Sequence, residues 1–163
     1  GEIGLDYYWK ENPPKEFQEQ VFRRQIDLAL ELDLPIIVHD REAHADTYAL
    51  LKKYRPKGVL HCFSGSAEDA AWLTAQGLYI GFGGAATFKG AKRAVKAAAI
   101  VPPDKLLVET DCPYMAPEPC RGRRCDSSLI AHTAAFLAEV RGEETERLLE
   151  TTCQNARALF GLG

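Results

Sequence analysis

The sequence predicts an α/β fold in which parallel strands alternate with helices, and three observations support this class. Short runs of apolar, branched side chains recur between longer segments in which apolar residues are three to four positions apart. Successive runs begin about 20 to 35 residues apart, as in the right-handed crossover units of a parallel sheet. The chain has 163 residues, 46% apolar and 26% charged, and is long enough to bury a sizeable core. We therefore expect one domain over residues 1–163.

The elements follow in a regular order from the N-terminus. Residues 1–6 predict a short Gly-rich strand, and residues 14–32 predict a helix because apolar side chains such as Phe22 and Ile26 recur at helical spacing. Residues 34–38 form an unbroken apolar run that is typical of a strand buried on both faces. The remaining elements are helices over about residues 43–54, 67–76 and 91–99, strands over 58–61, 78–82 and 105–109, and two or three helices within 127–160.

Five strands are compatible with two architectures. A doubly wound sheet is one, but the Gly-rich phosphate-binding fingerprint of its nucleotide-binding forms is absent, and Gly81, Gly83 and Gly84 are only a weak cluster. The other is the larger part of an eight-unit barrel, whose active sites use polar residues at the carboxyl ends of successive strands. The polar residues of this chain therefore decide between the two.

Charge and composition exclude several classes of protein. Twenty basic and 23 acidic residues give a net charge of −3, so nothing global attracts the chain to nucleic acid or to an anionic membrane. No stretch approaches the roughly 20 apolar residues of a membrane helix, and we expect no membrane partner. The five cysteines are odd in number and follow no basic, apolar leader, which favours reduced thiols and a cytoplasmic location.

Four potential metal ligands lie in or directly after expected strands. Glu2 is in the first strand, His39 and His61 end the second and third, and Asp111 follows the fifth. A single histidine after a strand is more often a structural hydrogen-bonding residue than a ligand. Four such residues in register are better explained by one divalent-metal site, because parallel strands bring their carboxyl ends to one face.

This ligand set indicates a class of chemistry. Imidazole and carboxylate together suit zinc, manganese, iron or magnesium, and nothing requires a thiolate site. A metal-activated water is the implied nucleophile against an ester, amide or phosphodiester. Glu2 suits a bridging position between two ions, and Asp111 could instead orient or deprotonate the water as a general base. Glu2 and Asp111 are thus the expected catalytic residues.

Several sequence strings resemble the TatD family of metal-dependent deoxyribonucleases. They occur in order over essentially the whole chain: GEIGLDYY at 1–8, PIIVHDREA at 35–43, HCFSGS at 61–66, ETDCPY at 109–114, and QNARALFG near the end. Each string alone is modest evidence. The first four, found in order and with compatible spacing, are specific for the family. The resemblance implies a TIM-barrel hydrolase of the amidohydrolase type that uses a divalent metal (Mg, Mn or Zn) and acts on DNA with exonuclease character. It also assigns Glu2, His39, His61 and Asp111 as metal ligands.

The sequence departs from the family pattern at its start. Family members begin with a strand carrying Asp-x-His-x-His and two more units before the GEIGLD string, and this sequence contains neither. The chain therefore resembles the last five of eight barrel units. Two imidazole ligands are missing, so we expect one metal site, a doubtful second one and reduced activity. Open sheet edges favour association, and we expect a homodimer or a related assembly.

Substrate contacts are expected from two further segments. Arg121, Arg123 and Arg124 follow Asp111 in a basic loop, and arginine suits phosphate because its donors form a fixed fork. A solvated charged loop is the alternative. Tyr8 follows the first strand, where an aromatic ring could stack on a base at a single-stranded or 3′ end of DNA, or pack against the rim.

The leading interpretation is hydrolysis of DNA phosphodiesters by a metal-activated water. One alternative keeps the architecture and replaces DNA with a small ester or amide. The other is a catalytically inactive, truncated remnant that serves as an assembly module. Metal-dependent cleavage of single-stranded DNA separates the first from both alternatives.

Overall fold

The computed structural model of the chain describes residues 1–162 and contains one five-stranded parallel sheet. The strands are β1 (Ile3–Asp6), β2 (Ile36–Arg41), β3 (Gly58–Leu60), β4 (Tyr79–Phe82) and β5 (Leu106–Val108). The helices are α1 (Lys15–Glu31), α2 (His44–Tyr54), α3 (Ala67–Ala75), α4 (Lys92–Ile100), α5 (Ile130–Arg141) and α6 (Thr145–Phe160). Short 3₁₀ turns are η1 (Gly84–Thr87), η2 (Pro103–Lys105) and η3 (Ser127–Leu129). The predicted α/β class is confirmed.

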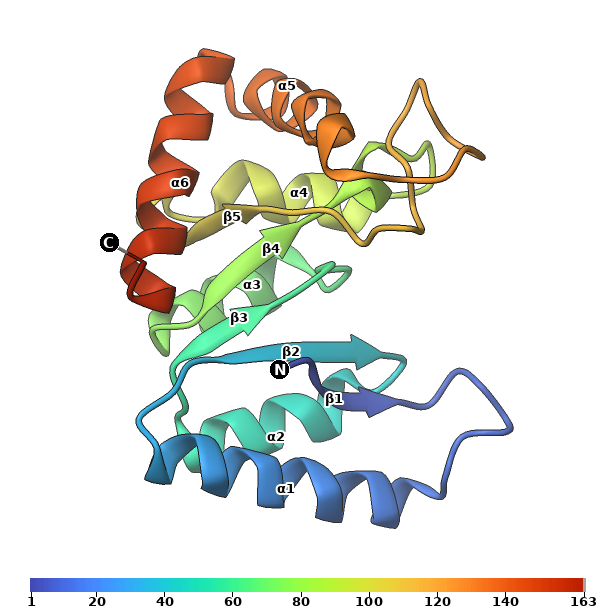
Figure 1. Cartoon of the computed structure of the whole chain (residues 1–163), viewed down its shortest axis with the longest axis vertical. Coiled ribbons are helices and arrows are strands. Elements are labelled where there is room, and N and C mark those ends of the chain that lie inside the picture. Colours follow the sequence, from blue (N-terminus) through green and yellow to red (C-terminus); the bar gives the residue numbers. More distant parts are fainter. Residues whose placement is uncertain (163) are drawn as a thin grey trace.

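The order of the strands in the sheet is β1-β2-β3-β4-β5, the same as their order in the chain. A doubly wound sheet reverses its strand order at a switch point, whereas a barrel adds each strand beside the previous one. The sheet therefore has the barrel type of topology. In Figure 1 the strands fan from β1 and β2 at the bottom to β5 at the top, with α1 and α2 beside the first two strands and α4 and α5 beyond the last two.

The observed strand β2 is longer than its predicted range of residues 34–38. It continues through His39 to Arg41, because β1 pairs with this part of the chain and aligns Asp6 with Arg41. The Tyr7 amide extends the ladder by donating to the Arg41 carbonyl at 2.9 Å. The sequence placed the end of the strand at these polar residues, whereas pairing with β1 keeps them extended as part of β2.

The hydrophobic core lies between the sheet and its helices. Leu5, Val38, Leu60 and Ile80 come from four adjacent strands and are almost completely buried. Helical residues, including Phe22, pack against them from the outside of the curved sheet. Because side chains alternate along a strand, the residues between these positions point to the other face. That second face carries Glu2, His39 and the other potential ligands.

Gly4 allows β1 and β2 to approach closely beside the ligands. Its φ of 153° lies in a region that side chains rarely adopt, and a Cβ here would collide with the carbonyl of His39. Gly4 is paired with His39 in the sheet register. The glycine in the GEIG string therefore holds β1 at the distance from β2 that the site requires.

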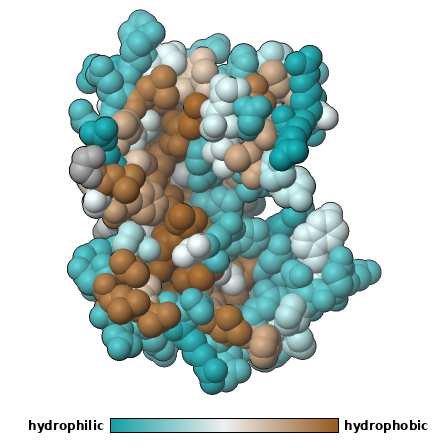
Figure 2. Space-filling view, viewed as in Figure 1, coloured by the Kyte–Doolittle hydropathy of each residue, from teal (hydrophilic) through white to brown (hydrophobic). Residues whose placement is uncertain are grey.

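Part of the apolar surface remains exposed along and just after α1. Six large side chains are 42–56% exposed there, namely Phe17, Val21, Leu28, Leu30, Leu32 and Leu34. Figure 2 shows apolar surface gathered on the left of the view and a hollow on the right between the lower and upper halves. Apolar surface of this kind was the basis for expecting a homodimer, which stays a prediction. Across residues 1–162, every helix is too short or too polar to cross a bilayer.

Candidate metal centre

Three potential ligands meet beside the first three strands. Glu2, expected within the first strand, directly precedes β1, whereas His39 lies within β2 and His61 directly follows β3. One oxygen of Glu2, Oε1, lies 2.9 Å from His39 Nδ1 and 2.9 Å from His61 Nε2. The two imidazole rings are 5.9 Å apart between centroids. The strand register explains this meeting, since β1 pairs Gly4 with His39 and the His61 amide donates to the Val38 carbonyl at 3.1 Å.

The carboxylate of Asp6 orients the imidazole of His39. Asp6 Oδ2 lies 3.1 Å from His39 Nε2, the ring nitrogen that faces away from Glu2. Gln18 fixes the backbone of Asp6, because its side chain accepts from the Asp6 amide at 2.9 Å and donates to the Asp6 carbonyl at 3.0 Å. A carboxylate behind a histidine sets the ring tautomer and makes its other nitrogen the better metal ligand.

Glu109 has the corresponding position behind His61, and the sequence interpretation missed it. Glu109 Oε1 lies 3.5 Å from His61 Nδ1 and accepts from the Cys62 amide at 2.5 Å. Gly81 provides the space, since a Cβ at Gly81 would lie 2.8 Å from Glu109 Oε2. Its place directly after β5, two residues before Asp111, could have identified it, because the structure brings both carboxylates near His61.

The carboxylates make this corner strongly favourable for a positive charge. Burial alone lowers the pKa of His61, but contact with Glu109 and the charges of Glu109, Glu2 and Asp111 outweigh it and raise that pKa above the usual 6.5. The same field disfavours a thiolate. Burial, followed by the charges of Glu109 and Asp111, raises the pKa of the Cys62 thiol well above its ordinary range.

The donor set fits a divalent metal ion. With protons on the ring nitrogens that face Asp6 and Glu109, His39 and His61 each turn a lone pair toward the same oxygen of Glu2. Glu2 Oε1 and the two ring nitrogens that lie 2.9 Å from it then repel one another unless a cation lies among them. Two nitrogens and a carboxylate oxygen are also the mixed ligand set of zinc, manganese and iron sites.

His61, Cys62 and Glu109 form a second group of potential donors, again within ligand distance of one another. This group is the poorer site, because metals bind the thiolate and the Cys62 thiol is held protonated. All five cysteines are free, including Cys120 and Cys125.

Asp111 lies across a cleft from the three-residue cluster. The cleft has a volume of about 700 Å³, and its polar lining includes Glu2, His39, His61 and Asp111. Asp111 is half-buried and near enough to His61 to raise the pKa of that ring, yet it is outside the group of mutually close donors. The structure therefore brings all four predicted ligands to one cleft and three of them into contact.

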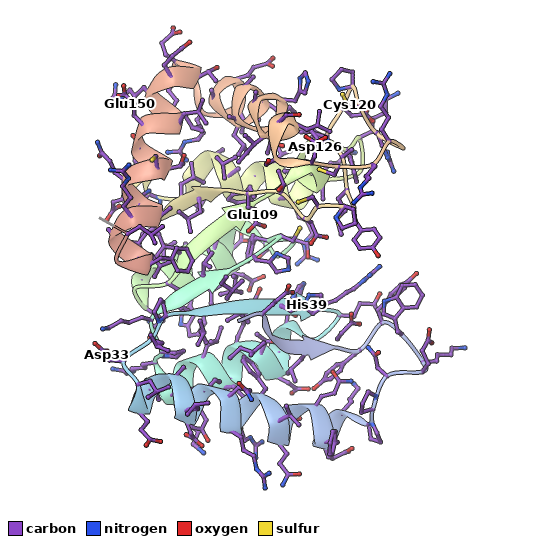
Figure 3. All side chains as sticks on the ribbon, viewed as in Figure 1. Asp33, His39, Glu109, Cys120, Asp126 and Glu150 are labelled. Carbon is purple, nitrogen blue, oxygen red and sulfur yellow. The ribbon has the colours of Figure 1, made fainter. Side chains whose placement is uncertain are left out.

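The three loop arginines lie apart from the residues that line the cleft in residues 1–162. Arg121 stacks on Phe88, with its Cζ 4.1 Å from the ring centroid, and Arg123 and Arg124 are exposed. Figure 3 places the labelled Cys120 and Asp126 of this loop at the upper right, away from His39. Asp126 accepts from the Ser128 amide at 2.9 Å and so begins η3. Tyr8 is 46% exposed beside the cleft.

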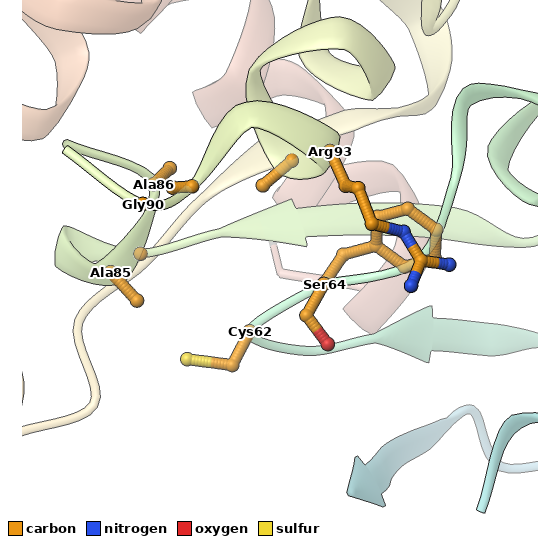
Figure 4. A pocket seen from close by; sticks show the side chains of 10 residues that line it. Cys62, Ser64, Ala85, Ala86, Gly90 and Arg93 are labelled. Carbon is orange, nitrogen blue, oxygen red and sulfur yellow. The ribbon is translucent and has the colours of Figure 1, made fainter. Parts of the chain in front are cut away.

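A smaller pocket of about 180 Å³ adjoins the cleft and is lined by residues that follow β3 and β4. Cys62, Ser64 and Ala85 line both cavities, and Arg93 stands at the rim of the smaller one (Figure 4). Arg93 lies 3.9 Å from Asp69 and is largely exposed. The smaller pocket is thus a mostly apolar extension of the cleft with one basic side chain at its edge.

Comparison with known proteins relates this arrangement to a family. A family model described as TatD related DNase matches residues 1–161. An uncharacterized metal-dependent hydrolase, YabD of Bacillus subtilis, is 43% identical over 98% of this chain and 64% of its own length. The 3′-5′ ssDNA/RNA exonuclease TatD of Citrobacter koseri is 37% identical over 99% of this chain and 65% of its own length.

A solved structure has the same fold. YJJV, a TatD homolog from Escherichia coli, superimposes with a TM-score of 0.92 at 33% identity, over 100% of this chain and 63% of that one. The chain thus spans less than two thirds of the length of these relatives. The predicted TIM-barrel type of fold and the predicted family are both confirmed. The chain belongs to the TatD-related DNase family of metal-dependent hydrolases.

Proposed function

We propose that the chain hydrolyses phosphodiester bonds at the ends of single-stranded DNA with a divalent metal held by Glu2, His39 and His61. The observation that carries this proposal is the single Glu2 oxygen 2.9 Å from a nitrogen of each histidine. The family supports the hydrolase class, and the name of the Citrobacter relative supports a single-stranded nucleic acid substrate. When bound, the metal supplies Lewis acidity toward a phosphoryl oxygen and makes nearby water more acidic.

Other residues of the chain orient the metal ligands and accept the proton from water. Asp6 and Glu109 hold the two imidazoles so that the ligand nitrogens converge. Asp111, on the opposite wall, is in a position to accept a proton from the attacking water. Its carboxylate is half-buried and outside the ligand group, so we assign it the general-base role rather than a ligand role.

Substrate phosphates beyond the scissile bond are assigned to the basic loop. Arg121, Arg123 and Arg124 are exposed in the loop that follows Asp111 in the chain. Because they lie outside the cleft lining, we expect them to steer and hold the strand rather than to contact the reacting phosphate. One metal is sufficient for this arrangement.

Metal-dependent shortening of a labelled single-stranded oligonucleotide tests the proposal. We expect cleavage with Mn²⁺ or Mg²⁺, none with EDTA, and a loss of about 100-fold or more in Asp111→Asn, as for removal of a general base. Asp27→Asn, an exposed carboxylate on α1, is the matched control and should leave the rate unchanged. Turnover of a small ester or amide with no cleavage of DNA would overturn the proposal.

A further inference from the structure

Two aromatic rings after β1 form a cluster with an arginine at the mouth of the cleft. Tyr8 and Trp9 meet edge to face with ring centroids 4.8 Å apart, and both are nearly half exposed. Arg41, the last residue of β2, lies over them, with its Cζ 4.0 Å from the Tyr8 centroid and 5.4 Å from the Trp9 centroid. Exposed aromatic surface beside a cation suits a flat ring as ligand.

The three side chains have different positions relative to the cleft. Trp9 and Arg41 line it together with Glu2, His39 and His61. Tyr8 is outside the lining among the described residues and packs against Arg41 from behind. The ring that faces a bound substrate is therefore the indole of Trp9, with Tyr8 positioning the guanidinium.

The loop that carries the rings is anchored to the metal centre. Asp6 Oδ1 accepts from the Tyr8 amide at 3.0 Å, while Asp6 Oδ2 contacts His39. Asn12 closes the loop, because its side chain donates to the Asp6 carbonyl at 3.1 Å and its amide donates to the Trp9 carbonyl at 3.2 Å. One carboxylate thus holds both a ligand and the aromatic turn, so the distance from indole to metal site is set before substrate binds.

The opposite wall of the cleft is also apolar at its mouth. Tyr114 and Met115 follow β5, line the same cleft and are 70% and 39% exposed. Figure 2 shows a hollow between the lower and upper halves of the molecule. A flat ring entering the cleft therefore has apolar surface on either side and the imidazole pair at the inner end.

We propose that Trp9 and Arg41 form a stacking platform for the nucleobase next to the scissile phosphate of a single-stranded substrate. The proposal rests on the proposed function and adds its substrate-recognition residue. Stacking on an aromatic side chain is independent of sequence because every base has a π-face. It favours single strands because an unpaired base is free to contact the protein. The platform accordingly selects an unpaired end without reading its sequence.

Binding of base-containing and abasic strands tests the platform directly. The probe is a fluorescent single-stranded phosphorothioate oligonucleotide, which resists hydrolysis, with Mn²⁺ present, and a matched strand whose terminal residues lack bases. We expect Trp9→Ala to weaken the Kd for the normal strand about fivefold or more and to leave the abasic strand unaffected. Trp9→Phe should recover most of the loss, and Phe17→Ala, an exposed ring on α1, is the control.

Tryptophan fluorescence gives a second readout that needs no turnover. The chain has two tryptophans, and Trp72 lies on α3 against Tyr48. Emission of Trp72→Phe, which keeps Trp9, should be quenched by the normal strand but not by the abasic one. Emission of Trp9→Phe should not change with either strand.

The results separate this proposal from the proposed function. Equal affinity of wild type and Trp9→Ala for the normal strand, with cleavage intact, overturns the platform alone. Base-dependent binding without any metal-dependent cleavage retains the platform and overturns the phosphodiesterase. A wild-type protein that binds neither strand overturns the platform, and metal-dependent cleavage of the unmodified labelled oligonucleotide then decides whether the phosphodiesterase stands.

Discussion

The two walls of the cleft differ in how firmly their polar side chains are held. On the wall of β1, β2 and β3, each histidine has a carboxylate behind it, Asp6 for His39 and Glu109 for His61. On the wall that follows β5, the chain from Asp111 leads into a loop that bonds mainly within itself, as in the Cys120 amide donating to the Pro117 carbonyl at 2.7 Å. Its arginines are exposed.

This difference matches two functions, metal binding on the first wall and substrate binding beyond the second. A metal needs donors at fixed distances, and strand register with hydrogen-bonded partners provides them. A flexible strand of substrate requires only charge at an approximate distance, which exposed side chains on a loop supply. We therefore expect variants on the first wall to act through metal affinity and variants on the second wall to act through substrate affinity.

The largest effect is expected from the ligands themselves. His61→Ala should lower metal affinity by more than the about 10- to 100-fold typical of an orienting residue, and it should abolish the metal-induced rise in Tm. Calorimetric titration with Mn²⁺ and thermal unfolding measure both quantities. His132→Ala, an exposed histidine on α5, should behave as wild type. An unchanged metal affinity in His61→Ala would contradict the assignment of metal binding to the wall formed by β1, β2 and β3.

The orienting carboxylates come next. Glu109→Gln and Asp6→Asn remove a charge and keep the shape, so each should reduce metal affinity by about 10- to 100-fold with little change in folding. Titration with Mn²⁺ in parallel with circular dichroism checks this. Asp27→Asn again serves as the control, since its carboxylate is exposed on α1. If the two variants bind metal as tightly as wild type, the contacts behind the imidazoles are structural only.

A smaller effect is expected from the basic loop that continues from the second wall and lies outside the cleft lining. Replacing Arg121, Arg123 and Arg124 together by alanine should raise KM for single-stranded DNA by roughly three- to tenfold and reduce the salt slope of binding by about two units. Metal affinity should stay the same. A triple variant at Arg23, Arg24 and Arg147, exposed on α1 and α6, matches the change in charge. A change in metal affinity, or equal effects in both triple variants, would show that the basic loop has no separate role.

The smallest effect concerns a histidine that is outside the cluster. His44 Nδ1 lies 2.6 Å from Asp40 Oδ2, and this hydrogen bond, opposed by burial, raises the pKa of His44 above 6.5. A raised folded-state pKa means that the pair stabilises the fold fully below pH 6.5 and loses that contribution as pH rises through the folded value. His44→Gln should lower Tm by at most about 4 °C at acidic pH and by less at alkaline pH. If the loss of Tm in His44→Gln became larger as pH rises, the His44–Asp40 hydrogen bond would not be the source of the stabilisation.

Most of the fold could be predicted from the order of residue types. The alternation of apolar runs and helical spacing located every strand, and the polar residues in or after the expected strands included Glu2, His39 and His61, which the structure brings together. Prediction was poorest at strand ends and loops. The polar residues His39, Asp40 and Arg41 extend β2 because β1 pairs with them, and no local pattern reveals a neighbour more than 30 residues away.

The sequence by itself determined which residue types follow each strand, and parallel strands then bring them to one face because their carboxyl ends coincide. Only the tertiary structure decided how these residues are used. Glu109 reaches the Cys62 amide 47 positions away, and Asp6 reaches His39 across 33 positions. Such contacts depend on register and on the space left by Gly4 and Gly81, which are properties of neighbouring strands rather than of any one segment.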